Sequence, residues 1–193
     1  MMEYINLESA LQEGQRYVAQ AASELRIDVK ALRHDVATDT CHEKAELLGW
    51  DDVERVVKAV FFYKGKDLYG FIFPELGSEE DPRHIDKKET LPKILGVSRK
   101  QAKSFHNAYC PEGMEYGTCT PFVLEGSFDD DKDKQLRKIF IHDYKRIDEE
   151  TVDISIGGKG EDAHKTSLHL TYSGIYNILR HKFGDRIEKA NLF

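Results

Sequence analysis

The apolar and polar positions at the start of the chain follow the period of an α-helix. The apolar residues recur on one helical face, at Leu7, Leu11, Val18, Ala21, Ala22 and Leu25. This spacing predicts an amphipathic helix from about Leu7 to Leu25, although Gly14 costs it about 1 kcal/mol relative to alanine. We therefore expect residues 1–26 to form an N-terminal helical extension and residues 27–193 to form the main domain.

Several later segments alternate apolar and polar residues, or carry short apolar runs, as β-strands do. The predicted strands are Ile27 to His34, Val53 to Tyr63, Leu68 to Phe73, Lys138 to His142, Thr151 to Ile156 and Ser167 to Leu170. Gly65 lies in a turn between the second and the third of these strands. We therefore expect these two strands to form a hairpin.

Short helices are predicted between and after the strands. They run from about Cys41 to Leu48, Ile85 to Leu95, Ser98 to His106 and Ser173 to Phe183. Thr38 to Thr40 can cap the first of them, Gly49 can end it, and Ser98 can cap the third. Many strands with peripheral helices and no internal repeat predict one domain of the α/β or α+β class.

Length and composition limit the class of protein further. The chain has 193 residues, enough for one domain with a sizeable core, and no apolar run reaches the roughly 18–20 residues of a membrane span. The N-terminus lacks the features of a secretory signal, and the 3 cysteines have no framework spacing, so we expect a reduced, cytoplasmic protein. The net charge of −7 argues against broad nucleic-acid binding but permits local basic patches, such as Lys87-Lys88, Arg99-Lys100 and Arg180 to Lys182.

Two lysines are candidates for anion binding. Lys58 lies inside an apolar strand; it either faces solvent, as the period of two permits, or points into a cleft and binds a phosphate or a carbonyl. Lys159 belongs to Gly157-Gly158-Lys159-Gly160, which is either a plain hairpin turn or a loop of N–H groups that cradles an anion. This segment lacks the spacing of a nucleotide-binding P-loop, so nucleotide hydrolysis is rejected.

The cysteines and histidines give weaker hypotheses. Cys41-His42, His106 with Cys110, and His164 with His169 lack the spacing of known metal motifs, so no metal site and no cofactor are expected. Cys119 is either a nucleophile or a small buried hydrophobic residue, and the second reading is the commoner one.

One loop has the composition of a ligand-binding turn. Gly117-Thr118-Cys119-Thr120-Pro121 follows a Pro-Glu-Gly turn. Gly117 lets the backbone approach a ligand closely, and Pro121 restricts the exit of the chain. Such loops are common, so the function of this one depends on its surroundings.

The order of these motifs resembles the YbaK and prolyl-tRNA-synthetase-associated editing-domain family of aminoacyl-tRNA deacylases. The segments that carry the resemblance are His34-Asp35 with the helix ending at Gly49, Val56 to Phe61 with Lys58, Ile85 to Lys88, Leu95 to Lys100, Gly117 to Pro121, Ile154 to Lys159, Leu168 to Leu170, and Ile178-Leu179. The loop matches the family's GxxxP motif. The resemblance covers roughly residues 27–187 and implies a single domain with a mixed, mostly antiparallel β-sheet surrounded by helices.

The resemblance also implies a function: a trans-acting enzyme that hydrolyses the ester of a mischarged tRNA, without a metal and without a covalent intermediate. The implied catalytic residues are Lys58, Gly117, Thr118 and Thr120. The implied substrate-binding residues are His34, Cys119, Pro121, Ser155, Gly157, Gly158, Lys159, Ser167 and His169. The resemblance implies the acceptor end of the mischarged tRNA as a partner and leaves an aminoacyl-tRNA synthetase open as a second one. It implies no contact with a membrane.

The chain departs from the family pattern in three places. Ala59 follows the lysine where many relatives have threonine, Ile156 stands where some have serine, and Ser167 stands near the place of an aspartate. These changes leave the substrate amino acid open, and they leave open a domain that binds tRNA ends or a synthetase without hydrolysis. A cysteine-dependent hydrolase centred on Cys119 is a third hypothesis. The sequence does not determine the oligomeric state.

Overall fold

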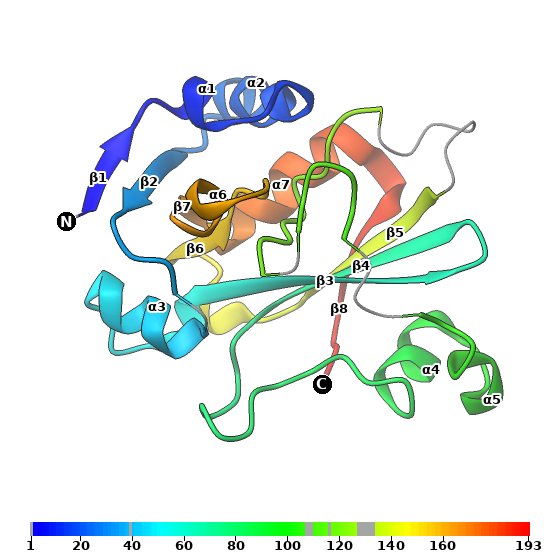
Figure 1. Ribbon diagram of the computed structural model, residues 1–193. Helices are drawn as coiled ribbons and strands as arrows, with labels where there is room; N and C mark the ends of the chain where they lie inside the picture. The colour runs from blue at the N-terminus through cyan, green and yellow to red at the C-terminus, as the bar shows by residue number, and fades with distance from the viewer. Residues whose placement is uncertain (1, 39, 107–109, 116, 127–133) are drawn as a thin grey trace.

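The structure is a computed structural model, and it describes residues 2–38, 40–106, 110–115, 117–126 and 134–193. Its centre is an eight-stranded sheet with the strand order β1-β2-β7-β6-β3-β4-β5-β8 (Figure 1). The strands are β1 (Met2–Ile5), β2 (Lys30–His34), β3 (Val56–Lys64), β4 (Asp67–Pro74), β5 (Gln135–His142), β6 (Thr151–Ser155), β7 (Thr166–Thr171) and β8 (Ile187–Ala190).

The sheet is mixed, as predicted. Neighbours are antiparallel in the pairs β1–β2, β2–β7, β7–β6 and β3–β4, and parallel in β6–β3, β4–β5 and β5–β8. The predicted hairpin is confirmed as β3 and β4. The single α/β domain expected from the sequence is therefore the observed fold.

Helices and short 3₁₀ turns surround the sheet. They are α1 (Leu7–Ala10), η1 (Glu13–Gln15), α2 (Arg16–Leu25), α3 (Cys41–Leu48), η2 (Val53–Arg55), α4 (Thr90–Leu95), α5 (Arg99–Ala102), η3 (Lys145–Ile147), α6 (Glu161–His164), α7 (Tyr172–Phe183) and η4 (Gly184–Arg186). None of the helices in the described part of the chain is long and apolar enough to span a membrane.

Alternate residues of β3 point into two separate hydrophobic clusters, as the period of a strand requires. Val57, Ala59 and Phe61 pack in one cluster with residues of α2 and α7. Phe62 packs in the other, with residues of β4, β5, α4 and α5. Lys58 therefore lies on the opposite face of the sheet from α7.

The predicted helix from Leu7 to Leu25 is wrong as a continuous element. It ends at Ala10, Leu11 is extended (φ −74°, ψ 139°), and α2 begins only at Arg16. The cause is a tertiary contact at Gly14, whose carbonyl accepts a hydrogen bond of 2.7 Å from Glu125 N. A Cβ atom at Gly14 would lie 2.9 Å from the Leu124 Cβ, so only glycine permits this approach.

Other boundaries follow local rules more closely. The helix Cys41–Leu48 is confirmed, with a capping box between Thr40 and Glu43 and a left-handed Gly49 (φ 68°) at its end. Two predicted strands begin later than expected, at Lys30 and at Val56. The helices predicted after Ile85 and after Ser98 are shorter than expected, and β1, α6 and β8 were not predicted.

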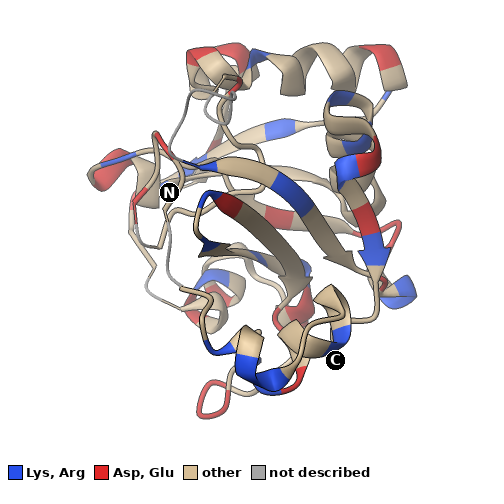
Figure 2. Ribbon diagram, turned by 90° about the vertical axis from the view of Figure 1, so that its right-hand side faces the viewer, with Lys and Arg blue, Asp and Glu red and all other residues tan. Residues whose placement is uncertain are grey.

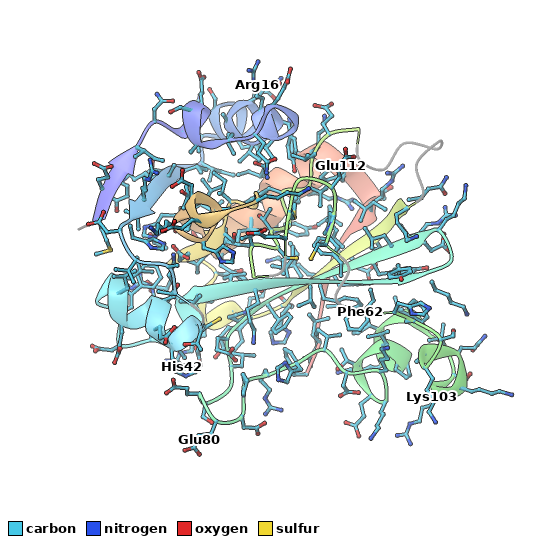
Figure 3. The ribbon with its side chains drawn as sticks, in the orientation of Figure 1. Arg16, His42, Phe62, Glu80, Lys103 and Glu112 are labelled. Atoms are coloured by element: carbon cyan, nitrogen blue, oxygen red, sulfur yellow. The ribbon has the colours of Figure 1, made fainter. Side chains whose placement is uncertain are left out.

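Exposed basic residues gather on the segment that contains α4 and α5, at the bottom of Figure 2. They are Lys88, Lys93, Arg99, Lys100 and Lys103. By contrast, Arg180 pairs with Asp185 and Lys182 with Glu125. Figure 3 shows that Lys103 lies at the opposite end of the molecule from Arg16.

Candidate functional site

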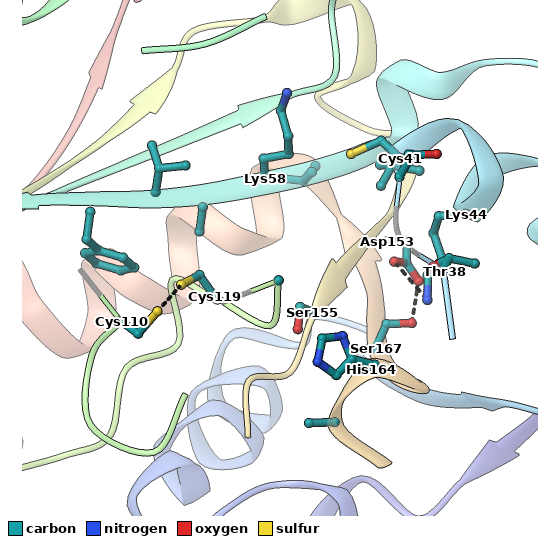
Figure 4. Close-up of a pocket in the computed structure, with 18 of the residues that line it drawn as sticks. Thr38, Cys41, Lys44, Lys58, Cys110, Cys119, Asp153, Ser155, His164 and Ser167 are labelled. Atoms are coloured by element: carbon teal, nitrogen blue, oxygen red, sulfur yellow. Dashed lines mark hydrogen bonds and ion pairs between the residues drawn. The ribbon is translucent and has the colours of Figure 1, made fainter. Parts of the chain in front are cut away.

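A cavity of about 480 Å³ opens where β3 and β6 part from each other. The two strands pair at only two positions, Val56 with Asp153 and Val57 with Ile154. Beyond these positions the loop from Gly117 to Pro121 faces β3, and both contribute to the wall of the cavity (Figure 4). A cavity of this volume is in the range that holds a small molecule or the end of a larger one.

The free edge of β3 brings backbone groups to this cavity. Val56 O accepts a hydrogen bond from Glu75 N on the β4 side, whereas Tyr63 exchanges hydrogen bonds with His106 on the other side. Because these directions alternate along a strand, the N–H and C=O groups of Ala59 also point away from β4. In the described ranges, no strand pairs with Ala59 on that edge.

The cavity contains some of the predicted site residues and excludes others. Those that line it are Lys58, Gly117, Cys119, Ser155 and Ser167. Those that lie outside its wall are His34, Thr118, Thr120, Pro121, Gly157, Gly158, Lys159 and His169. Lys58 and Gly117 are therefore brought together at one cavity. Gly158 lies outside the wall and accepts a hydrogen bond from Thr118 of the Gly117–Pro121 loop.

Lys58 is held at the rim of the cavity by an ion pair. Its Nζ donates to Glu75 Oε2 at 2.6 Å and to Arg83 O at 2.8 Å. Burial alone would raise the pKa of Glu75, but hydrogen bonds from Lys58 and from the N–H groups of Gly77 and Arg83 together lower it. Figure 4 shows Lys58 and Cys119 on opposite sides of the β3 ribbon.

The Gly117–Pro121 loop and the loop that contains Gly157 and Gly158 are hydrogen-bonded to each other. The Thr118 hydroxyl lies 2.9 Å from Gly158 O and 3.0 Å from Glu115 O, and the Ser155 hydroxyl donates to Thr118 O at 3.0 Å. Thr118 and Thr120 are fully buried. The threonines therefore hold the shape of the loop, while Gly117 (φ +90°) presents its backbone to the cavity.

A buried polar cluster lies beneath α3, on the same face of the sheet as Lys58. Asp153 accepts hydrogen bonds from Ser167 and from His169 Nε2, the latter at 3.0 Å. Lys44 Nζ lies 3.8 Å from Asp153 Oδ1 and contacts His34 Nε2. Burial lowers the pKa of Lys44, and burial together with the Lys44 charge lowers the pKa of His34. His34 is therefore a neutral ring whose Nε2 accepts a hydrogen bond from the Lys44 ammonium.

Sequence reasoning missed Lys44, Asp153 and Glu115. Asp153 looked like a solvent-facing residue of a half-buried strand, and the helix that covers it is only visible in three dimensions. Ser167 lies on the adjacent strand β7, and its hydroxyl donates a hydrogen bond to Asp153. A charged residue inside a strand was the one available signal for Asp153.

The thiols on the cavity wall are poor nucleophiles. Cys119 Sγ lies 3.9 Å from Cys110 Sγ. Burial and the neighbouring Cys110 raise the pKa of the Cys119 thiol to about 12, and burial raises that of Cys41 to about 11. Among the residues that the structure describes, no group of three or more His, Cys, Asp or Glu side chains is placed to hold a metal ion.

Solved structures share this fold. One, described as a "putative trans-editing enzyme for prolyl tRNA synthetase", is 16% identical, with a TM-score of 0.58 over 94% of this chain and 98% of that chain. A hypothetical protein is 17% identical, with a TM-score of 0.53 over 90% and 97% of the two chains. A scaffold protein from epitope-grafting design is 13% identical, with a TM-score of 0.55 over 94% and 97%.

These likenesses confirm the editing-domain-like fold that the order of motifs predicted. No protein-family model matches the chain, and no curated protein matches it. At such low identity the likeness establishes the fold, and the chemistry has to be argued from the residues of this chain.

Proposed function

We propose that this protein is a trans-acting deacylase, which hydrolyses the ester between a wrong amino acid and the 3′-terminal adenosine of a tRNA. The observation that carries the proposal is the cavity of about 480 Å³ between β3 and the Gly117–Pro121 loop. It occurs in a fold shared with the protein described as a "putative trans-editing enzyme for prolyl tRNA synthetase". Its size suits a terminal nucleoside with a small amino acid.

The hydrolysis of an aminoacyl ester requires few catalytic groups. An aminoacyl ester is already activated, so a positioned water and N–H donors for the developing oxyanion can suffice. Gly117 has no side chain to obstruct the ester, and the edge of β3 at Ala59 offers backbone donors and acceptors. The Lys58 side chain is 21% exposed, so its ammonium is available to the phosphate or ribose of the terminal nucleotide.

The main alternative is a module that binds tRNA ends or a synthetase without hydrolysis. The observation that favours it is that Thr118, Ser155 and Lys58 are all bonded within the protein. The experiment that decides is deacylation of a panel of mischarged tRNAs by the purified protein. Binding of the tRNAs with no ester cleavage above the rate in buffer would select the alternative.

Lys58 gives the proposal a residue-level test. Lys58→Ala should lower the deacylation rate roughly tenfold, because a charged hydrogen bond to the substrate is worth about 1.5–3 kcal/mol. Lys64→Ala, an exposed lysine at the end of the same strand, is the matched control and should keep the wild-type rate. Equal rates for the two variants would remove Lys58 from the mechanism.

The role of Cys119 is tested by a conservative change. Cys119→Ser should retain deacylation within about twofold, because a thiol with a raised pKa contributes no thiolate near neutral pH. The measurement is the initial rate on the tRNA that the wild type cleaves fastest. Complete loss of activity, or a trapped thioester on Cys119, would restore the cysteine-hydrolase hypothesis.

The basic segment around α4 and α5 is proposed as the contact with the acceptor stem. It continues from His84 and Ile85 at the cavity wall to the exposed Lys100 and Lys103. Lys103→Ala should make kcat/KM less sensitive to salt, by about 0.7–0.9 in the log–log slope if one phosphate contact is lost. Arg16→Ala, at the other end of the molecule, should leave the slope unchanged; equal slopes in both variants would refute this surface.

A further inference from the structure

A histidine–carboxylate pair lies on the cavity wall next to the substrate loop. His164, the last residue of α6, lines the cavity (Figure 4). Gly117 lies next to its ring. Its Nε2 lies 3.0 Å from Glu115 Oε1, which also accepts a hydrogen bond of 2.9 Å from Gly160 N. The backbone of one loop thus holds the carboxylate that orients the ring.

This pairing determines which ring nitrogen is available. An ionised carboxylate only accepts hydrogen bonds, so Nε2 of neutral His164 carries the proton and Nδ1 has a free lone pair. In the described part of the chain, Nδ1 has no hydrogen-bond partner. The ring edge with Nδ1 lies at the substrate loop: a Cβ built on Gly117 would be 3.1 Å from His164 Cε1 and 3.6 Å from Nδ1.

We propose that His164 is the general base of the hydrolysis and that Glu115 is its positioning residue. This inference rests on the proposed deacylase function and adds a proton acceptor to it. The side chains are 31% and 39% exposed, so water and substrate reach the ring while the pair keeps its geometry. A glycine at position 117 then has two roles: it lets the ester approach the backbone, and it leaves room for the His164 ring.

The step balances with water as the only co-reactant. His164 Nδ1 takes a proton from water as its oxygen attacks the ester carbonyl, and the carbonyl becomes an oxyanion. The oxyanion re-forms the carbonyl as the bond to the ribose oxygen breaks. The imidazolium returns its proton to that oxygen, which leaves the free amino acid and a tRNA with its hydroxyl restored.

A second histidine–carboxylate pair lies on the surface, away from the cavity. His181 Nε2 lies 2.9 Å from Glu24 Oε2, with side chains 42% and 48% exposed, and neither residue lines the cavity. This pair shows what a surface ion pair of the same chemistry looks like. It therefore supplies the matched control variants.

Several charged or titratable groups of the described chain lie around His164. Glu115 faces the ring from the loop, and Cys119 lies on the same cavity wall. Within its own segment, Glu161 pairs with Lys165 and Asp162 with Arg33 at 2.6 Å. Lys44 and Asp153 line the cavity beneath α3. The other titratable side chains on its wall are those of Lys58, His84, Cys41 and Cys110. A pH profile can thus be compared between variants that leave all these groups in place.

The experiment measures hydrolysis of mischarged tRNAs and of an amino-acid p-nitrophenyl ester as a function of pH. His164→Asn and His164→Ala should each lower kcat roughly 10²-fold with little change in KM, and should remove the acid limb of the rate profile. His181→Asn should resemble the wild type. Two replacements at position 164 keep the test valid if one of them folds poorly.

Glu115 is tested by a readout that a purely structural role would not change. Glu115→Ala should lower kcat about tenfold, Glu115→Gln should recover part of it because an amide oxygen still accepts from Nε2, and KM should stay constant. Nitrogen-15 shifts of the His164 ring should report the Nε2–H form in the wild type and a mixture in Glu115→Ala. Glu24→Ala is the control.

The outcomes separate the two proposals. Cleavage of tRNA at the wild-type rate by His164→Ala would overturn the general base and leave the deacylase proposal intact. His164-dependent cleavage of the p-nitrophenyl ester without cleavage of any tRNA would overturn the tRNA function and support the base. Cleavage of neither substrate by the wild type would overturn both.

Discussion

Replacing Asp153 with alanine is expected to lower the free energy of unfolding by about 3–5 kcal/mol, the largest single effect that the structure predicts. The change removes the Asp153 carboxylate, whose Oδ1 lies 3.8 Å from Lys44 Nζ. The Lys44 ammonium then stays buried with neutral His34 as its remaining contact and no carboxylate to balance its charge. It also removes the acceptor for Ser167 and His169. The measurement is denaturant unfolding of the variant and of the wild type under the same conditions.

The double variant Lys44→Met with Asp153→Ala is the control for this explanation. With both charges removed, the uncompensated ammonium is gone, and much of the lost stability should return. If the double variant is as unstable as Asp153→Ala alone, then the cost arises from Ser167 and His169 and not from the lysine.

The pH dependence of the Asp153→Ala variant gives a second check. Burial lowers the pKa of Lys44 in the folded protein, so the unfolded chain binds more protons than the folded one. The stability contributed by this group therefore rises with pH through the range between its folded and its unfolded pKa. The deficit of Asp153→Ala should shrink as the pH is raised through that range.

Replacing Gln15 with leucine is expected to lower the free energy of unfolding by roughly 3 kcal/mol, because it leaves buried carbonyls without donors. Gln15 is fully buried, and its Nε2 donates to Phe122 O at 2.6 Å and to Ile156 O at 2.8 Å. These carbonyls lie at the ends of the two loops that are bonded to each other at the cavity. Deacylation should fall with stability, since both loops lose a common support.

Gln20→Leu is the matched control for this prediction. Gln20 is on the adjacent helix α2, and its side chain donates an exposed hydrogen bond from Nε2 to Glu24. Its replacement should change the free energy of unfolding by no more than about 0.5 kcal/mol. Unfolding of Gln15→Leu and Gln20→Leu at the same denaturant concentration would show that the buried bonds contribute nothing.

The hydrogen bonds of Gln15 also concern the predicted boundary between residues 1–26 and the main domain. The segment 1–26 was expected to be an extension, and its boundary stays a prediction. Its residues nevertheless complete the domain: β1 pairs with β2, and Val18 and Ala21 of α2 are buried in the main core. We expect a chain lacking these residues to lose the arrangement of both cavity loops.

Much of the fold was predictable because it depends on local rules. The Thr40 cap and the left-handed Gly49 specify α3 within a few residues, and the apolar runs on either side of Gly65 specify the β3–β4 hairpin. The break between α1 and α2 was not predictable, since it depends on a contact between Gly14 and residues more than 100 positions away. Short edge strands such as β1 are equally hard to recognise, because pairing rather than composition forms them.

The sequence by itself determined the six inner strands of the sheet, the glycine-containing loops and the position of Lys58 on one of two alternating faces. It did not determine which polar residues would be buried, because the period of two assigns residues to faces without showing what covers each face. Only the tertiary structure placed α3 over Asp153, turned the threonines of the Gly117–Pro121 loop inward, and brought Glu115 to His164 across 49 positions of the chain. Hydrogen bonds between distant segments decided these arrangements, and no local pattern encodes them.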